Sequence, residues 1–317
     1  MKIDKFWLSV LVILIAGFAF TKLADNEFYF FTTYVVLQGL IMAVAWNILG
    51  GFTGYVNFGS AGFFAVGVYT TVALNKAFGL PLPVLLLAAG VICGLLGLAA
   101  GYLTLRLKGV YFAIATLATA LVLETIVNNW KFVGGAAGTY VLQPKGSFIF
   151  DNYIELLFML MLVLAVAATA ISRYLSSSRI GQGLAAIRDD EVAAECMGVP
   201  TLRLKLISTT AMGALMGIAG APFPFFVTFV DPVSAFALVI AVNAIAMPMI
   251  GGTAVWYGPV IGALLLGAIQ ETATVTISSE LNLLIVGVML VLFITLAPKG
   301  IVGLIQDYKK KKGANNG

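Results

Sequence analysis

Residues 176–205 read SSSRIGQGLAAIRDDEVAAECMGVPTLRLK, a charged stretch within a chain that is otherwise strongly apolar. Its charged members are Arg179, Arg188, Asp189, Asp190, Glu191, Glu195, Arg203 and Lys205. Because charged side chains are costly in hydrocarbon, this stretch must lie outside a bilayer. We therefore predict a sizeable loop, residues 174–205, on one face of a membrane and open to a partner.

A short helix is expected inside this loop, at residues 190–197. The acidic residues at 189–191 stand where negative charge favours the positive end of a helix dipole. Gly198 fits the position just past a helix, and Pro200 follows where a helix cannot continue. The apolar side chains that share one face by i, i+4 spacing are Val192, Ala193, Cys196 and Met197. The helix is either a docking element or part of a solvated connector.

The composition places the whole chain in a membrane. Of 317 residues, 61% are hydrophobic and 10% are charged, and the mean hydropathy is +1.04; soluble domains carry about 25% charged residues. The chain has no histidine, which excludes histidine-based metal and catalytic motifs. It has no GxxxxGK(S/T) loop, so it does not bind ATP by that route. Its cysteines, Cys93 and Cys196, do not look like a disulfide pair.

The apolar segments predict an all-α polytopic protein with about ten spans, each near the ~20 residues that a bilayer requires. The expected spans are Phe6–Leu23, Thr33–Leu49, Ser60–Leu74, Pro81–Leu105, Val110–Trp130, Tyr153–Ile171, Leu206–Val227, Ser234–Ile250, Pro259–Val275 and Leu281–Ala297. We treat residues 1–317 as a single transmembrane domain.

The basic residues set the expected orientation, because cytoplasmic segments are rich in Lys and Arg. With the N-terminus inside, the inside segments hold Lys2, Lys5, Arg106, Lys108, Arg173, Arg179, Arg188, Arg203, Lys205, Lys299 and Lys309–Lys312. The outside keeps Lys22, Lys76, Lys131 and Lys145. Both termini, the charged loop and the basic tail 298–317 are therefore expected in the cytoplasm, where the tail is a topology anchor near anionic lipid. The long outside segment 131–153 either receives a soluble partner or is a linker.

Two glycine-rich breaks interrupt the apolar pattern. Residues 50–60 read GGFTGYVNFGS, and residues 251–259 read GGTAVWYGP. Paired interruptions of this kind indicate broken helices around a transport pathway, or they are ordinary turns. The shorter second break favours a turn. In the first, Asn57 and Ser60 among glycines favour a pathway, because irregular backbone at membrane depth must face protein or water.

Two ionisable residues lie within expected spans, Glu124 and Glu271. Intramembrane carboxylates are costly and often functional. They either line a hydrophilic path or cap local polar networks between helices. Asn47, Asn243, Thr116 and Thr119 are weaker candidates, since such residues more often bond across helices than to a ligand.

Four stretches resemble the permease subunit of branched-chain amino acid ABC importers, of the LivM type. Residues 46–59 (WNILGGFTGYVNFG) are similar to the family segment N-L-x-x-G-Y-T-G-x-x-S-x-G-H. Residues 106–118 (RLKGVYFAIATLA) are similar to R-L-R-G-x-Y-x-A-I-x-T-L-A. Residues 181–205 resemble its cytoplasmic loop, and residues 251–262 resemble its Gly-Gly turn. The resemblance covers most of the chain beyond the first span.

This resemblance implies an ABC importer permease fold and a non-catalytic membrane subunit for branched-chain amino acid import. It implies a second homologous permease chain, two cytoplasmic ATPases that use ATP, an extracytoplasmic binding protein, and a bacterial inner-membrane location. The loop helix becomes a coupling helix for the ATPase, with Arg188, Asp189, Asp190, Glu191, Ala193, Ala194, Glu195 and Gly198 as candidates. The candidate pathway residues are Asn47, Thr53, Gly54, Asn57, Ser60, Tyr111, Thr116, Glu124 and Glu271. No metal site, cofactor of its own or nucleic-acid partner is expected.

The sequence also departs from the family pattern. Ser60 stands where the family often has His, and residues 138–141 (GTYV) stand where it often has Gly-Leu-Thr-Gly. Residues 254–256 replace a further glycine in the second break. The alternatives are therefore an ABC permease for urea, short amides or other amino acids, and a secondary transporter driven by an ion gradient.

Overall fold

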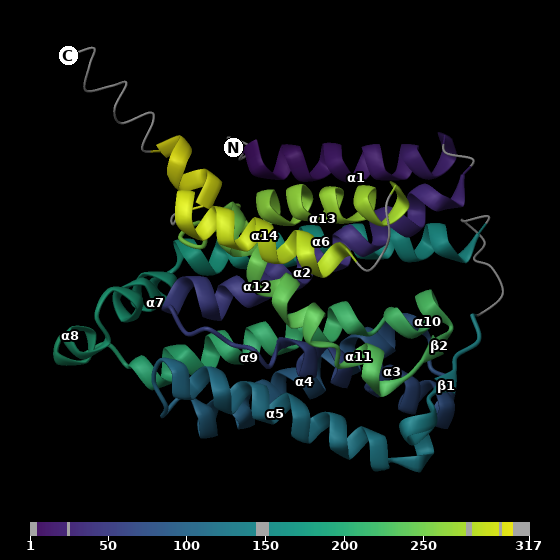
Figure 1. Ribbon diagram of the computed structural model, residues 1–317, viewed down its shortest axis with the longest axis horizontal. Coiled ribbons are helices and arrows are strands. Elements are labelled where there is room, and N and C mark those ends of the chain that lie inside the picture. Colours follow the sequence, from purple (N-terminus) through teal and green to yellow (C-terminus); the bar gives the residue numbers. More distant parts are fainter. Residues whose placement is uncertain (1–4, 24–25, 144–151, 277–280, 298–299, 307–317) are drawn as a thin grey trace.

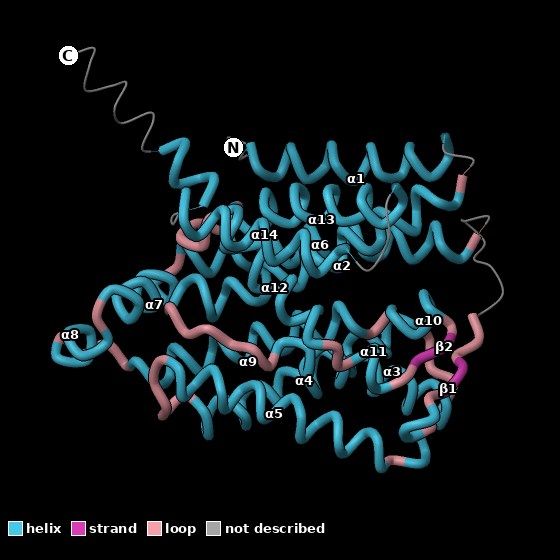
Figure 2. The backbone as a smooth tube through the Cα atoms, in the orientation of Figure 1, coloured by secondary structure: helices cyan, strands magenta, loops and turns pink. Residues whose placement is uncertain are grey.

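The computed structural model describes residues 5–23, 26–143, 152–276, 281–297 and 300–306, and these are helical almost throughout (Figures 1 and 2). The long helices are α1 (Lys5–Leu23), α2 (Glu27–Thr53), α3 (Ser60–Phe78), α4 (Leu82–Thr104), α5 (Val110–Asn129), α6 (Tyr153–Ser177), α9 (Thr201–Gly220), α12 (Leu238–Gly251), α13 (Gly258–Thr276) and α14 (Leu281–Leu296). The all-α fold class is confirmed.

The short elements gather at the two ends of the bundle. Helices α7 (Arg179–Asp189) and α8 (Glu191–Cys196) lie at one end, and strands β1 (Thr139–Tyr140) and β2 (Phe229–Val230) pair antiparallel at the other (Figure 1). The remaining short elements are the 3₁₀ turns η1 (Lys131–Val133) and η2 (Gly135–Ala137) and helices α10 (Phe223–Val227) and α11 (Pro232–Ala235). Lys145 and the tail residues 307–317 lie outside the described residues.

Seven of the described helical segments are long and apolar enough to cross a membrane, whereas the sequence predicts about ten spans. The segments expected at Ser60–Leu74, Pro259–Val275 and Leu281–Ala297 are helical but do not meet this standard. Helix α3 contains Thr70, Thr71 and other polar residues, α13 contains a Gln-Glu-Thr run, and α14 has 16 residues. The expected count is therefore matched only roughly.

Helix α2 is the central element of the fold. It contacts α6, α9, α12 and α13, and its second half, from Leu40 to Thr53, is buried throughout. It begins at Glu27, capped by the Asn26 side chain, which accepts a hydrogen bond from the Phe28 N–H at 3.0 Å. Because every face of this half is covered by protein, α2 holds the other long helices around itself.

The first glycine-rich break begins later than the sequence indicates. Helix α2 continues through Gly50 and Gly51 to Thr53, and Gly54, which follows it, has φ +79° and donates its N–H to the Gly50 carbonyl. A Cβ on Gly50 would overlap the Trp46 ring, so glycine is required by packing within the helix. The irregular backbone is therefore restricted to residues 54–59.

The second glycine-rich break is a tight turn, which confirms the simpler interpretation. Helix α12 ends at Gly251 and α13 begins at Gly258. A Cβ on Gly251 would overlap the Gly258 carbonyl, so the two backbones approach too closely for any side chain. The helices on either side of this turn pack against each other.

Helices α4 and α9 form an extensive interface built on small residues. A Cβ on Gly97 would lie 2.7 Å from the Thr209 carbonyl oxygen. Small residues at such interfaces let helix backbones approach closely, which is how helices gain packing energy in lipid. This interface fixes the position of α9, whose first turns belong to the charged segment.

Candidate coupling surface and membrane cavity

The short helix predicted at residues 190–197 is present as α8. Asp190 caps its first turn, because its Oδ1 accepts hydrogen bonds from the N–H groups of Val192 (2.9 Å) and Ala193 (3.0 Å). Beyond the helix, Gly198 has φ +83°, which glycine adopts without strain. These two local signals fix where α8 begins and ends.

One face of α8 is apolar and open. Met197 is 85% exposed and Val192 is 61% exposed, and Ala193 and Cys196 are exposed beside them. Ala194 is buried and attaches the helix to the rest of the chain. Figure 1 shows α8 projecting at the end of the bundle. A projecting apolar face of this kind is typical of a site for a partner protein.

Helix α7 supports α8, although the sequence indicates only a loop there. The Ser178 hydroxyl caps α7 by accepting a hydrogen bond from the Gly181 N–H at 3.3 Å. Leu184 and Ile187 are buried, and α7 packs against α2, α6 and α9. The charged segment is therefore a folded platform.

A buried ion pair ties α8 to the membrane helices. Lys205, near the start of α9, places its Nζ 2.7 Å from Glu191 Oε1. The same Nζ donates to the Tyr55 hydroxyl at 3.0 Å and lies 4.5 Å from the centre of the Tyr55 ring. The Tyr55 hydroxyl in turn donates to Glu191 Oε2 at 2.6 Å. We call Tyr55, Glu191 and Lys205 the coupling triad.

The triad is well shielded from water. The Lys205 side chain is 3% exposed and that of Glu191 is 14% exposed. Burial acts to raise the pKa of Glu191, but the hydrogen bonds from Lys205 and Tyr55 and the charges of Lys205 and Lys108 hold its pKa below the ordinary value. Burial and the hydrogen bond to Glu191 raise the pKa of Tyr55, which stays neutral. The triad is therefore a charge-assisted link between α8, α9 and the segment after α2.

The other acidic candidates of the loop have different surroundings. Glu195 Oε1 accepts a hydrogen bond from the Thr201 hydroxyl at 2.6 Å, so it is used within the chain. Asp189 is largely exposed and lies 3.5 Å from Arg188 Nε. A partner can therefore reach Asp189 directly, while Glu191 points toward the chain's own Lys205.

A groove joins the platform to the first glycine-rich break. It has a volume of about 580 Å³. Its lining includes Thr53, Gly54, Tyr55, Phe58, Lys108, Arg188 and Glu191. Two candidate pathway residues, Thr53 and Gly54, thus share one hollow with two candidate coupling residues, Arg188 and Glu191.

The polar residues deeper in the break are packed against protein. Asn57 is buried and its Oδ1 accepts from the Gly59 N–H at 2.6 Å, while its carbonyl accepts from Trp46 Nε1 at 2.8 Å. The Phe58 N–H donates to the Thr116 hydroxyl at 3.1 Å. Asn47 and Ser60 are fully buried. In this conformation Asn57, Trp46 and Thr116 hold the irregular backbone in place.

Two candidates on α5 lie apart from these groups. Tyr111 is 74% exposed, and Glu124 is partly buried. Helix α5 packs on α3 and α4, and its outer side is apolar, with Ile114 and Val122 exposed. This side of α5 faces lipid or another chain.

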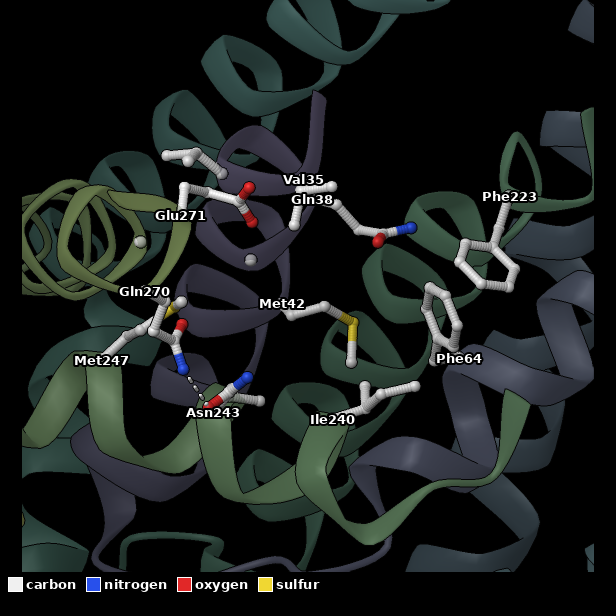
Figure 3. Close-up of a pocket in the computed structure, with 14 residues that line it drawn as sticks. Val35, Gln38, Met42, Phe64, Phe223, Ile240, Asn243, Met247, Gln270 and Glu271 are labelled. Atoms are coloured by element: carbon white, nitrogen blue, oxygen red, sulfur yellow. Dashed lines mark hydrogen bonds between the residues drawn. The ribbon is translucent and has the colours of Figure 1, made fainter. Parts of the chain in front are cut away.

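Glu271 lies at a cavity within the helical bundle. The cavity has a volume of about 260 Å³ and is formed by α2, α12 and α13, with α3 and α10 closing one side (Figure 3). Its polar side chains are Gln38, Asn243, Gln270 and Glu271, and its apolar ones include Val35, Met42, Phe64, Phe223, Ile240 and Met247. Gln270 Nε2 donates to Asn243 Oδ1 at 3.2 Å.

A second hollow continues from this cavity. It has a volume of about 440 Å³ and shares Val36 and Glu271 with the first. It extends to Phe28 and Thr32 in the first turns of α2, the end of α2 opposite the platform (Figure 1). Glu271 therefore stands where the two hollows meet.

Sequence reasoning missed several members of these sites. Lys205 reads as one more cytoplasmic charge, and Tyr55 reads as an aromatic residue in a turn. Gln38 is a single polar residue in an apolar helix, and Asn243 is only a weaker candidate, because this pattern usually marks a bond across helices. The available signal was their presence in otherwise apolar spans, but only the fold places them together.

Comparison with known proteins gives the family. The profile described as "Branched-chain amino acid transport system / permease component" matches residues 28–294. The high-affinity branched-chain amino acid transport system permease protein LivM of Escherichia coli (strain K12) is 28% identical over 304 residues, covering 88% of this chain and 71% of the relative. The corresponding LivH of that organism is 21% identical, covering 83% of this chain and 90% of the relative.

A solved structure shows the same fold. It is described as PsaBC from Streptococcus pneumoniae in complex with Fab, and it aligns with a TM-score of 0.50 at 15% identity over 94% of this chain and 99% of that one. The chain is thus a polytopic membrane permease. It belongs to the family of permease components of branched-chain amino acid transport systems, as its motifs indicate.

Proposed function

We propose that the chain is the membrane-spanning permease of an ATP-driven importer of branched-chain and similar apolar amino acids. The observation that carries this proposal is the open apolar face of α8, joined by the coupling triad to α9 and to the segment after α2. An ATPase that docks on this face would have a direct connection to α9 and to the segment after α2. A segment that served only as a solvated connector would not require a buried ion pair to the membrane helices.

The proposed assembly has five chains, counting this one. Two cytoplasmic ATPases bind α8 here and its counterpart in a second, homologous permease, and they alone use ATP. The similarity to both LivM and LivH of one organism supports a second permease of the same family. A binding protein delivers cargo on the outside, so specificity is shared with it. The complex sits in the bacterial inner membrane with both termini of this chain in the cytoplasm.

In the proposed mechanism, ATP binding draws the two ATPases together and displaces α8. The movement passes through Glu191 and Lys205 to α9, and through Tyr55 to the end of α2. Access to the cavities then changes from outside to inside. Bound nucleotide can shift the equilibrium between the outward-open and inward-open states only if the complex binds it with different affinity in the two states. Asn57 and Thr116, which bond to the irregular backbone after α2, would act as the pivot.

The test is uptake of labelled leucine by vesicles that hold the whole complex, with ATP inside and unlabelled valine, urea or a polar amino acid as competitors. We expect uptake that requires ATP, is inhibited by valine and is unaffected by urea. Competition by urea alone would indicate that the substrate is urea or a short amide. Uptake without ATP that stops when ion gradients are dissipated would identify a secondary transporter instead.

A further inference from the structure

The cavity at Glu271 has two chemically different sides. Glu271, Gln270 and Asn243 lie on one side, and Phe64, Phe223 and Ile240 lie on the other (Figure 3). The mechanism proposed above uses the groove and the triad and assigns this cavity no ligand. Its lining contains a carboxylate but no positively charged side chain.

We propose that this cavity binds the transported amino acid in transit, with the Glu271 carboxylate accepting the ammonium group of the cargo. The inference rests on the proposed function, because it names the site and the recognition chemistry for the cargo of that importer. The cargo class is a small zwitterion with an aliphatic side chain.

The charge on Glu271 is the first argument. A carboxylate within a membrane protein requires a partner, since burial of an unpaired charge is expensive. Among the described residues that line the two hollows, none supplies a cation. The ammonium group of an amino acid is a cation of suitable size, and it arrives from the hollow that reaches Phe28 and Thr32.

The two amide side chains give the second argument. Asn243 Oδ1 accepts a hydrogen bond from Gln270 Nε2, which fixes the orientation of the Asn243 amide. Its nitrogen then points toward the middle of the cavity (Figure 3). An N–H donor and a carboxylate that line the same cavity match the two ends of a zwitterion, the carboxylate of the cargo accepting from Asn243.

The apolar wall gives the third argument. Met42, Ile240, Phe64 and Phe223 offer a hydrocarbon surface for an aliphatic side chain (Figure 3). Sites for drug-sized ligands have volumes of about 300–1,000 Å³, and this cavity of about 260 Å³ falls just below that range. It therefore suits a single small amino acid better than a peptide.

The first arm of the test measures transport by the whole complex in vesicles. Glu271→Gln should raise the KM for leucine at least tenfold, and Glu271→Asp should restore most of the loss. Inhibition by 4-methylpentanoate, which is leucine without its ammonium group, should be equal in wild type and Glu271→Gln. The matched control is Glu27→Gln, which removes an exposed acidic charge from α2 at a residue that lines neither hollow.

The second arm detects binding without relying on a Glu271 variant. Ile240→Cys is placed in a Cys196→Ser background, because Cys196 is exposed whereas Cys93 is buried. Leucine should slow its reaction with a small water-soluble thiol reagent at least threefold, and 4-methylpentanoate should not. If the cysteine at position 240 reacts at the same rate with and without leucine, the proposed site is contradicted.

The outcomes separate the two claims. If the wild-type complex transports leucine with ATP while Glu271→Gln keeps its KM and leucine gives no protection, the site is wrong and the proposed function stands. If the wild type transports urea but not leucine, the proposed function and the site fail together. A raised KM with protection by leucine supports both.

Discussion

The coupling triad makes a strong prediction about stability. Glu191→Gln leaves the Lys205 ammonium buried, with the Tyr55 hydroxyl and the Leu105 carbonyl as its other partners. Removing one member of a buried ion pair costs about 3–5 kcal/mol. Because Gln can still accept one hydrogen bond from Lys205, we expect the free energy of unfolding to fall by an amount near the lower limit, about 3 kcal/mol.

Replacing the other member of the pair, Lys205, should lower the free energy of unfolding by a smaller amount. In Lys205→Met the Glu191 carboxylate is 14% exposed, keeps the hydrogen bond from Tyr55 and lies 3.7 Å from Lys108. It is therefore partly compensated, and we expect a loss of about 1–2 kcal/mol. With both changes present no buried charge remains at the pair, so the double variant should lose about 2 kcal/mol rather than the sum of about 4–5 kcal/mol.

The assay is equilibrium unfolding of the purified chain in mixed detergent micelles, analysed as a double-mutant cycle. The expected coupling free energy between Glu191 and Lys205 is about 2–3 kcal/mol. The exposed pair Arg188 and Asp189 is the matched control, and its coupling should be below about 1 kcal/mol. Losses at Glu191 and Lys205 that simply add, within about 0.5 kcal/mol, would refute the reasoning.

Three further outcomes are expected. Asp190→Ala should destabilise α8 by about 0.5–2 kcal/mol, seen as faster hydrogen exchange at Val192 and Ala193, and unchanged exchange would contradict the cap. Gly97→Val should lower the free energy of unfolding by at least about 1–3 kcal/mol, because its Cβ would lie 2.7 Å from the Thr209 carbonyl oxygen. The control is Ala88→Val in the same helix. Equal melting temperatures for the two variants would contradict the close contact. Since the pKa of folded Glu191 is lowered, its contribution to stability should be complete above its unfolded pKa of about 4.3 and be lost as pH falls through the lower folded value. Wild type should therefore lose more stability than Glu191→Gln on acidification, and parallel profiles would contradict this.

Local signals in the sequence were sufficient for some elements. The acidic residues at 189–191 and Gly198 mark the ends of α8, since capping depends on neighbours in the chain. The turn at residues 251–258 is also predictable from its glycines. Both features are decided within a few residues.

Features that depend on distant residues could not be predicted in this way. Helix α2 continues past Gly50, although the glycine pair suggests a break, because this half of the helix is buried against helices distant in sequence. Lys205 pairs with Glu191 and Tyr55, and the latter is 150 residues away. The cavity needs Gln38, Asn243 and Glu271 from three helices, so only tertiary packing reveals it.

The central claim is that the open face of α8 receives the ATPase that drives transport. The most direct measurement is the amount of ATPase that copurifies with a Met197→Arg permease, since Met197 is 85% exposed and its replacement leaves the interior unchanged. The control is Leu142→Arg, an equally exposed apolar residue near the opposite end of the bundle. We predict at least a tenfold loss of bound ATPase for Met197→Arg alone, about 1.4 kcal/mol or more of docking energy. Full retention of the ATPase, with normal ATP-driven leucine uptake, would contradict the account.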